Sequence, residues 1–290
     1  VMGNIDEFPV QFTPTIALQP NPNLSHTEKQ YEQLNNCKLR RERTEYILYL
    51  ADAIRERLWA FRRNTGKKPE RIIVFRDGVS DGQFKKVLRQ ELKGMLDAFK
   101  SMPGDYRPQI TYVVLQKGHH TRLFCSNLND SCGKAQNVPP GTLLCTKVLH
   151  PERFTFYLVS HFGIQGTSRP VRYTVLYDEV GFSLEGMANL AYHLCHVYCR
   201  CQRSVSIPAP VYYADLVCQR ARHYVAAWRK RQDAAWMSDE ASSVSDETHA
   251  TAGVSEEAVI EVELSRQRIM EDCKAATHFR EKLEQIMFFA

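Results

Sequence analysis

The chain has 290 residues, of which 43% are hydrophobic and 24% charged, an ordinary composition for a globular protein with its own core. No apolar run approaches the ~20 residues of a membrane-spanning helix, so we expect no membrane insertion. Residues 1–6 lack the basic-then-apolar order of a secretory signal. Because position 1 is Val and not Met, we expect a piece of a longer protein.

The basic character is concentrated in part of the chain. The net charge is +5, but residues 233–263 contain nine acidic residues and no Lys or Arg, so the remainder carries +14. A folded part this basic favours a polyanionic partner, although charge alone does not name it.

The nine cysteines are scattered along the sequence. Cys195, Cys199 and Cys201 fall close together, but no second pair with zinc-site spacing accompanies them. This pattern favours reduced structural thiols over a metal site, as in a cytoplasmic protein. The cytoplasm is therefore the expected location, with the nucleus as the alternative.

Helix and strand patterns alternate along the chain. Residues 1–20 predict two strands around a turn, and the apolar spacing of 39–63 predicts a helix. The remaining patterns predict strands over 71–75, 110–116, 142–149, 154–160 and 171–177, and helices over 80–100, 183–201 and 209–230. This order indicates an α/β fold with a mixed central sheet flanked by helices.

Three regions follow from the composition. Residues 1–231 form the predicted folded core. Residues 232–258 are rich in Ser, Thr, Ala and acidic side chains without a period, so we expect a disordered acidic loop. Residues 259–290 predict a final helix and an apolar C-terminus that docks on the fold.

Two carboxylates lie where chemistry collects in such folds. Asp77 ends an apolar strand, and Asp215 lies in the first turns of a helix opened by Pro210. Each also has a structural interpretation, because Asp favours turns and stabilises the N-terminal ends of helices. The residue types alone leave both interpretations open.

Four motifs carry a family resemblance. Residues 76–84 (RDGVSDGQF) resemble the RDGVS-x-GQF block of eukaryotic Argonautes. The blocks at 116–124, 163–170 and 204–214 resemble Argonaute blocks in the same order and spacing. The resemblance covers essentially the whole chain and implies the RNase H-like fold of a PIWI domain.

The resemblance implies a site for two Mg²⁺ (or Mn²⁺) ions, which prefer hard oxygen ligands. Asp77 matches one ligand of the family. Asp215 occupies the fourth ligand position, where members carry His or Asp. Glu45 matches the glutamate that precedes the first long helix, with Glu42 as a rival.

The sequence departs from the family at the first catalytic Asp. In the family this residue lies on a strand upstream of the segment that Val1 resembles, and Asp6 matches a turn residue instead. We therefore expect an N-terminally truncated PIWI domain, in which cleavage of target RNA needs the full-length protein. The alternative is an Argonaute that binds guide and target RNA but silences through partner proteins without cutting.

The matched blocks also imply contacts to a small guide RNA. Most of these residues would neutralise backbone phosphates, so recognition would fall to pairing between guide and target RNA. Arg220 matches a residue that helps to bind the guide's 5′ phosphate, a task that suits a guanidinium. The remaining residues are Lys117, Arg122, His161, Arg169, Tyr198, Arg200, Ser206 and Tyr212. The pair His119–His120 has no third metal ligand nearby and is interpreted as support for the fold.

One further set implies a protein partner. Phe61, Lys68 and Tyr106 match positions that line tryptophan pockets in animal Argonautes, which bind glycine-tryptophan repeat proteins. An aromatic ring beside a lysine stem suits an indole. Phe61 also completes the apolar stripe of its helix, so a core role is equally consistent with the pattern.

Overall fold

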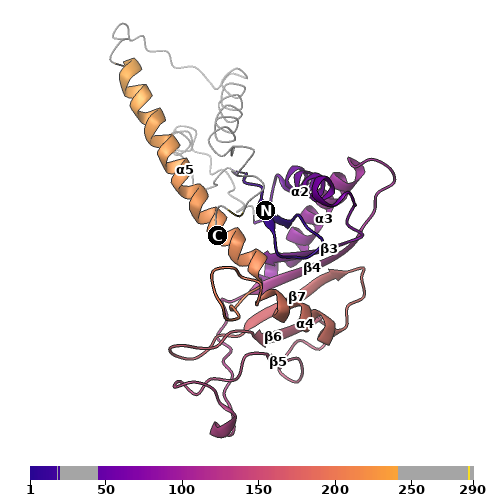
Figure 1. The fold of residues 1–290 in the computed structure, drawn as a ribbon, viewed down its shortest axis with the longest axis vertical. Helices are drawn as coiled ribbons and strands as arrows, with labels where there is room; N and C mark the ends of the chain where they lie inside the picture. Colours follow the sequence, from indigo (N-terminus) through magenta and orange to yellow (C-terminus); the bar gives the residue numbers. More distant parts are fainter. Residues whose placement is uncertain (18, 20–44, 241–286, 288–290) are drawn as a thin grey trace, which may run out of the picture.

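The computed structural model describes residues 1–17, 19, 45–240 and 287. The strands are β1 (Met2–Asn4), β2 (Phe12–Pro14), β3 (Arg71–Asp77), β4 (Gln109–Gln116), β5 (Thr142–Leu144), β6 (Thr155–Val159) and β7 (Val171–Asp178). The helices are α2 (Leu50–Thr65), α3 (Phe84–Lys100), α4 (Leu184–Leu194) and α5 (Ala209–Glu240), with short 3₁₀ turns η1 (Asp81–Gln83) and η2 (Leu128–Asp130). Figure 1 shows the sheet at the centre of the molecule, with α5 rising from it.

The main sheet has five strands in the order β3-β4-β7-β6-β5. β3 and β4 are parallel, with Asp77 opposite Leu115, and the other pairs are antiparallel. The predicted mixed sheet is therefore confirmed. β1 and β2 form a separate antiparallel pair.

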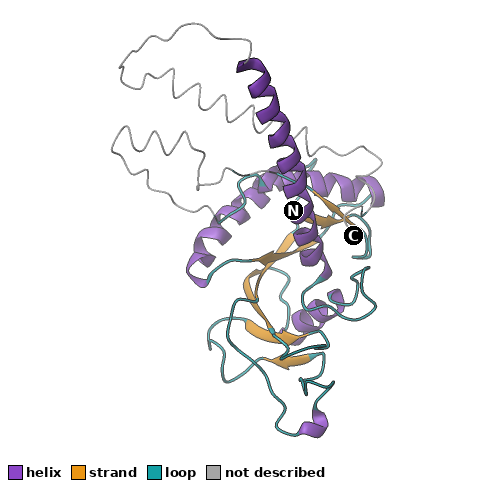
Figure 2. Ribbon diagram, turned by 90° about the vertical axis from the view of Figure 1, so that its left-hand side faces the viewer, coloured by secondary structure: helices purple, strands orange, loops and turns teal. Residues whose placement is uncertain are grey.

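Strand β4 lies at the centre of the core. Tyr112 and Val114 face a cluster that includes apolar side chains of α2 and α3, whereas Val113 and Leu115 face a cluster that includes side chains of α4 and the start of α5. All four are fully buried. A strand covered on both faces reads as a continuous apolar run, as this one does, and Figure 2 shows helices on either side of the strands.

A third apolar cluster joins the small sheet to α5. Phe12 packs against Tyr213, with ring centroids 5.6 Å apart, and both side chains are buried. Met287 packs against the same cluster. The residues on either side of Met287 lie outside the described residues, so the docking of the C-terminus stays a prediction.

Two helix predictions needed correction at the ends. In the described part of the chain, the helix expected over 39–63 begins at Leu50, because the backbone N–H groups of Ile47 and Leu48 donate to the side chains of Glu91 and Gln19. Residues 39–44 lie outside the described residues. The helix expected over 183–201 ends at Leu194. The Tyr213 hydroxyl accepts from the backbone N–H of Cys199 and donates to the carbonyl of Val197, which holds this segment in a turn.

Two further boundaries differ. The strand expected over 142–149 ends at Leu144, and Lys147 then adopts a left-handed φ of 63° that turns the chain. α5 continues through Glu240, so the predicted acidic loop cannot begin at 232. The rest of that loop, the predicted helix over 259–286, Glu42 and the final three residues lie outside the described residues. In the described part, no helix has the length and apolar character needed to cross a membrane.

Candidate functional site

Asp77 lies at one end of the main sheet, near enough to Asp215, an exposed residue of α5, for their charges to interact. Asp77 is the last residue of β3, and Gly78, with a φ of 77°, lets the chain turn away directly after it. Burial raises the pKa of Asp77, and the negative charge of Asp215 raises it further, whereas the Lys117 ammonium opposes these effects. The sheet and α5 thus hold two like charges close enough to repel.

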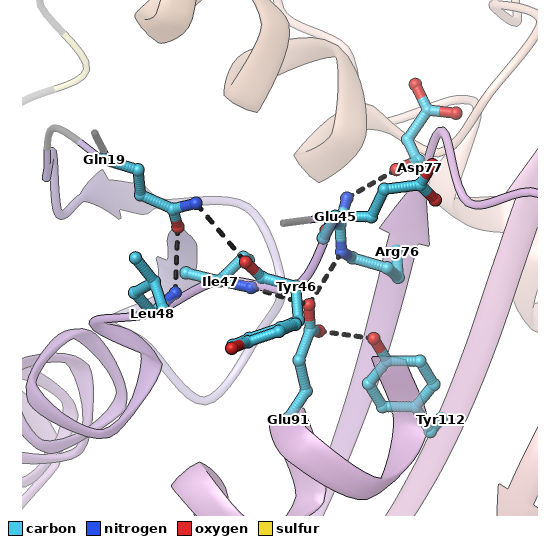
Figure 3. Close-up of polar contacts among 9 residues, drawn as sticks. All are labelled: Gln19, Glu45, Tyr46, Ile47, Leu48, Arg76, Asp77, Glu91 and Tyr112. Carbon is cyan, nitrogen blue, oxygen red and sulfur yellow. Dashed lines mark hydrogen bonds and ion pairs between the residues drawn. The ribbon is translucent and has the colours of Figure 1, made fainter. Parts of the chain in front are cut away.

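Glu45 is joined to the same end of the sheet through Arg76. The Arg76 guanidinium donates to the backbone carbonyls of Glu45 and Asp77, at 2.7 and 2.6 Å. Figure 3 shows the side chains of Glu45 and Asp77 together at the end of β3. The Glu45 Oε2 atom is buried and has no hydrogen-bond partner. The predicted glutamate therefore approaches Asp77 from a different segment of the chain.

The three carboxylates do not form a closed ligand group. Among the residues that the structure describes, no three His, Cys, Asp or Glu side chains could hold one metal ion. Their chemistry nevertheless fits a divalent cation. Asp77 faces a like charge, and Glu45 has an unpartnered buried oxygen. Hard oxygen donors with such unmet needs suit Mg²⁺, which usually retains several waters and needs few protein ligands.

A second group, the Lys117 cluster (Lys117, Tyr198, Ser206 and Tyr212), lies beside the carboxylates. Lys117 follows β4 directly, and its Nζ donates to Ser206 Oγ at 3.0 Å and lies 5.2 Å from the centre of the Tyr212 ring. The Ser206 and Tyr212 hydroxyls are 3.2 Å apart, and the Tyr198 and Tyr212 rings are 5.1 Å apart. Four of the nine predicted guide contacts are thus brought together from three segments.

His161 lies near Lys117 but has a different character. Burial lowers the pKa of His161, and the Lys117 ammonium lowers it further. Its Nδ1 atom is buried and unpartnered. The ring is therefore neutral near pH 7 and brings a hydrogen-bonding group, not a charge, to the cluster.

The four arginines predicted to contact the guide differ in their contacts and exposure. Arg122 Nη1 donates to the carbonyls of His119 and Thr121, at 3.2 and 2.8 Å, so this guanidinium holds its own loop. Arg169, Arg200 and Arg220 are exposed. His119 contacts the carbonyl of Pro170 at 2.8 Å and packs edge-on against Tyr157, as expected for a fold-supporting histidine.

Two of the three residues predicted to line the tryptophan pocket are in contact. Lys68 Nζ lies 5.5 Å from the centre of the Tyr106 ring and donates to the carbonyl of Pro103. The Tyr106 hydroxyl donates to the carbonyl of Pro69 at 2.7 Å. Phe61, on α2, is half-buried. The structure therefore brings Lys68 and Tyr106 together and leaves the indole-binding role a prediction.

Two buried polar residues were missed by the sequence analysis. Asn137 Nδ2 donates to the carbonyl of Gly166, and its Oδ1 accepts from the N–H of Ser168, so it holds the loop that carries Arg169. Glu91 is 1% exposed, inside the apolar stripe of α3. The sequence carried a signal for the burial of Glu91, because position 91 is four residues from both Val87 and Met95 and so falls on the buried face of the helix.

Comparisons with known proteins agree with this architecture. The Piwi domain model matches residues 23–226. The chain belongs to the Piwi domain family. It is 55% identical over 190 residues to a putative protein, tag-76, of Caenorhabditis elegans, a match that covers 66% of this chain and 18% of that protein. The chain thus spans less than a fifth of this relative.

Solved structures show the same fold. The C-terminal lobe of a budding yeast Argonaute matches with a TM-score of 0.73 and 23% identity, over 100% of this chain and 49% of that one. Kluyveromyces polysporus Argonaute, solved with a guide RNA, matches with a TM-score of 0.70 and 23% identity, over 100% of this chain and 30% of that one. Drosophila Piwi matches 58% of this chain and 23% of its own, with 34% identity and a TM-score of 0.51. The predicted RNase H-like fold of a PIWI domain is confirmed.

Proposed function

We propose that this Piwi domain binds a small guide RNA and its target, and that the full-length protein cuts the target with the help of divalent cations. The observation that carries the proposal is the opposition of Asp77 and Asp215 beside the Lys117 cluster at one end of the sheet. Carboxylates that need a cation therefore adjoin a cationic and aromatic surface that suits a phosphate backbone. The membership of the family supports RNA as the polyanion.

Asp77, Asp215 and Glu45 are the residues that would hold Mg²⁺. When bound, two such ions supply charge stabilisation for in-line displacement at a phosphodiester. The chain's own residues position the RNA. Lys117 neutralises a backbone phosphate, and the hydroxyls of Ser206 and Tyr212 are close enough to donate to the same group.

Guide anchoring is assigned to the exposed arginines of the proposed interface. Arg169, Arg200 and Arg220 are exposed on three separate segments, so each guanidinium is accessible to a backbone phosphate. Arg220 is proposed to contact the 5′ phosphate of the guide. Contacts of this type fix the register of the guide without reading bases, so the sequence of the target is read by base pairing.

The test is target cleavage by the full-length protein, loaded with a 5′-phosphorylated guide in the presence of Mg²⁺. Asp77→Asn and Asp215→Asn should each reduce the cleavage rate by about a hundredfold or more, because a ligand oxygen loses its charge. Guide binding should stay within about twofold. Asp105→Asn, an exposed loop carboxylate, is the matched control. Cleavage at the wild-type rate in both site variants would remove the metal role.

A second function is favoured by the contact of Lys68 with Tyr106. In this alternative the protein binds guide and target but silences by recruiting a tryptophan-rich partner, whose indole would take the place of the lysine over the ring. Tight target binding without cleavage, by a protein shown to be loaded, would favour it. A tryptophan-bearing peptide should then bind wild type and lose affinity for Tyr106→Ala.

A further inference from the structure

Glu91 is a buried carboxylate that joins three segments of the chain. It lies on α3, its side chain is 1% exposed, and it accepts hydrogen bonds from Arg76 Nε at 3.2 Å, the backbone N–H of Ile47 at 3.1 Å and the Tyr112 hydroxyl. Burying a carboxylate is costly unless it is paired and hydrogen-bonded, and here both needs are met. Figure 3 shows these contacts converging on the one side chain.

Arg76 extends the connection from Glu91 to the candidate site. Its Nε donates to Glu91, while its two terminal nitrogens donate to the backbone carbonyls of Asp77 and Glu45. A guanidinium suits this task because its donors are fixed in one plane. Arg76 thus ties α3, the end of β3 and the segment before α2 into one arrangement.

The segment that carries Glu45 depends on such side-chain contacts. Residues 45–48 precede the N-cap residue of α2, Tyr49, whose carbonyl accepts the helical hydrogen bond from the N–H of Ala53. On one side, the amide of Gln19 accepts from the N–H of Leu48 at 2.9 Å and donates to the carbonyl of Tyr46 at 3.3 Å. On the other side, Glu91 holds Ile47 and Arg76 holds Glu45. Of these two attachments, the second is the more deeply buried.

We infer that Glu91 and Arg76 are positioning residues that hold the backbone of Glu45 beside Asp77, so that the Glu45 carboxylate is presented at the carboxylate site. This inference rests on the proposed metal-dependent cleavage. Neither residue touches the substrate. Glu91 fixes the orientation of Arg76, and Arg76 fixes the distance between the backbones of Glu45 and Asp77.

The first test compares Glu91→Gln with Tyr112→Phe in the full-length, guide-loaded protein. The amide keeps the size of the side chain but loses the charge that pairs with Arg76. Cleavage should fall by about ten- to a hundredfold, as for the loss of an outer partner of a metal ligand, and the Mg²⁺ concentration for half-maximal rate should rise. Tyr112→Phe removes one contact to Glu91 but leaves Arg76 and Ile47 in place, so its rate should change less than about threefold.

Guide and target binding separate positioning from general damage. Both affinities should stay at the wild-type value in Glu91→Gln, because the Lys117 cluster does not include Arg76 or Glu91. A wild-type cleavage rate in Glu91→Gln would overturn the inference. Equal losses in cleavage and guide binding would overturn it too. Arg76→Lys keeps the ion pair but cannot bridge two carbonyls, so it should show the same defect if Glu91→Gln folds poorly.

A second measurement does not depend on cleavage. Hydrogen exchange of the amides of residues 46–49 should accelerate at least about tenfold in Glu91→Gln and Arg76→Lys, while the amides of β4 stay as protected as in wild type. If the wild-type protein does not cut, the proposed function fails, but this measurement still decides the positioning role. Unchanged exchange of residues 46–49 in both variants would refute it.

Discussion

The carboxylate site and the Lys117 cluster lie at the same end of the sheet but are stabilised in opposite ways. Lys117 has its partners within the protein: the Ser206 hydroxyl and the face of the Tyr212 ring. Asp77 faces Asp215, a group of its own charge. The Lys117 cluster is therefore assembled by attraction between its own side chains. The carboxylates repel each other, so the packing of the backbone elements that carry them, together with the nearby Lys117 ammonium, must hold them in place.

This difference shows which contacts fix the side chains of each region. The Lys117 cluster is ordered by local side-chain contacts, so it should change little when RNA binds. In the carboxylate site, Arg76 holds the backbone of Glu45 and is itself paired with the buried Glu91. Repulsion between its carboxylates is a cost that a cation removes.

The largest effect on guide binding is expected at Lys117. Lys117→Ala in the full-length protein should weaken guide binding about tenfold at moderate salt and reduce the slope of log affinity against log salt by about one, because one phosphate contact is lost. Filter binding over a range of KCl concentrations measures both. Lys67→Ala is the control, since Lys67 is an exposed lysine paired with Glu7. An unchanged slope in Lys117→Ala would remove Lys117 from the proposed interface.

A smaller effect is expected at Asp77, where substitution should raise stability instead of lowering affinity. The pKa of Asp77 is higher in the folded protein than in the unfolded chain. Ionisation of Asp77 therefore lowers the free energy of unfolding as the pH rises above the pKa of the unfolded chain. Asp77→Asn should therefore stabilise β3 at pH 7 without divalent cations. The gain should be small, because Asp77 is only half-buried and solvent screens part of the repulsion.

The measurement is hydrogen exchange of the β3 amides at pH 7, with and without Mg²⁺. Protection should rise in Asp77→Asn, and added Mg²⁺ should protect wild type more than the variant. Weaker protection in Asp77→Asn without Mg²⁺ would contradict the repulsion that distinguishes this region from the Lys117 cluster.

The smallest effect is expected at His161. Burial lowers the pKa of His161 in the folded protein. The contribution of the neutral ring to stability is therefore complete above about pH 6.5, the pKa of the unfolded chain, and is lost as the pH falls from there to the lower pKa of the folded protein. Near pH 7.5, His161→Gln should bind guide within about twofold of wild type with the same salt slope, because no charge is lost. A reduced slope would show that His161 is charged in the complex and adds a second cation beside the Lys117 cluster.

Local signals predicted the position of the site, and longer-range contacts set its boundaries. The apolar run before Asp77 predicted β3 and its end, because strand periodicity and Gly78 are local signals. The end of α4 could not be predicted, since it depends on the Tyr213 hydroxyl, fourteen residues from Cys199. Glu45 was selected by resemblance alone. Its attachment to Asp77 through Arg76 joins segments 31 residues apart and leaves no pattern in the sequence.

The loop that carries Arg169 has a consequence for how this surface can vary. A Cβ atom on Gly163 would lie 2.4 Å from both Asn137 Nδ2 and Ser168 Oγ, and Asn137 in turn holds Gly166 and Ser168. Any larger residue at 163 therefore displaces the amide that shapes the loop. The shape of the loop therefore depends on the absence of a side chain at position 163 as much as on the amide at position 137.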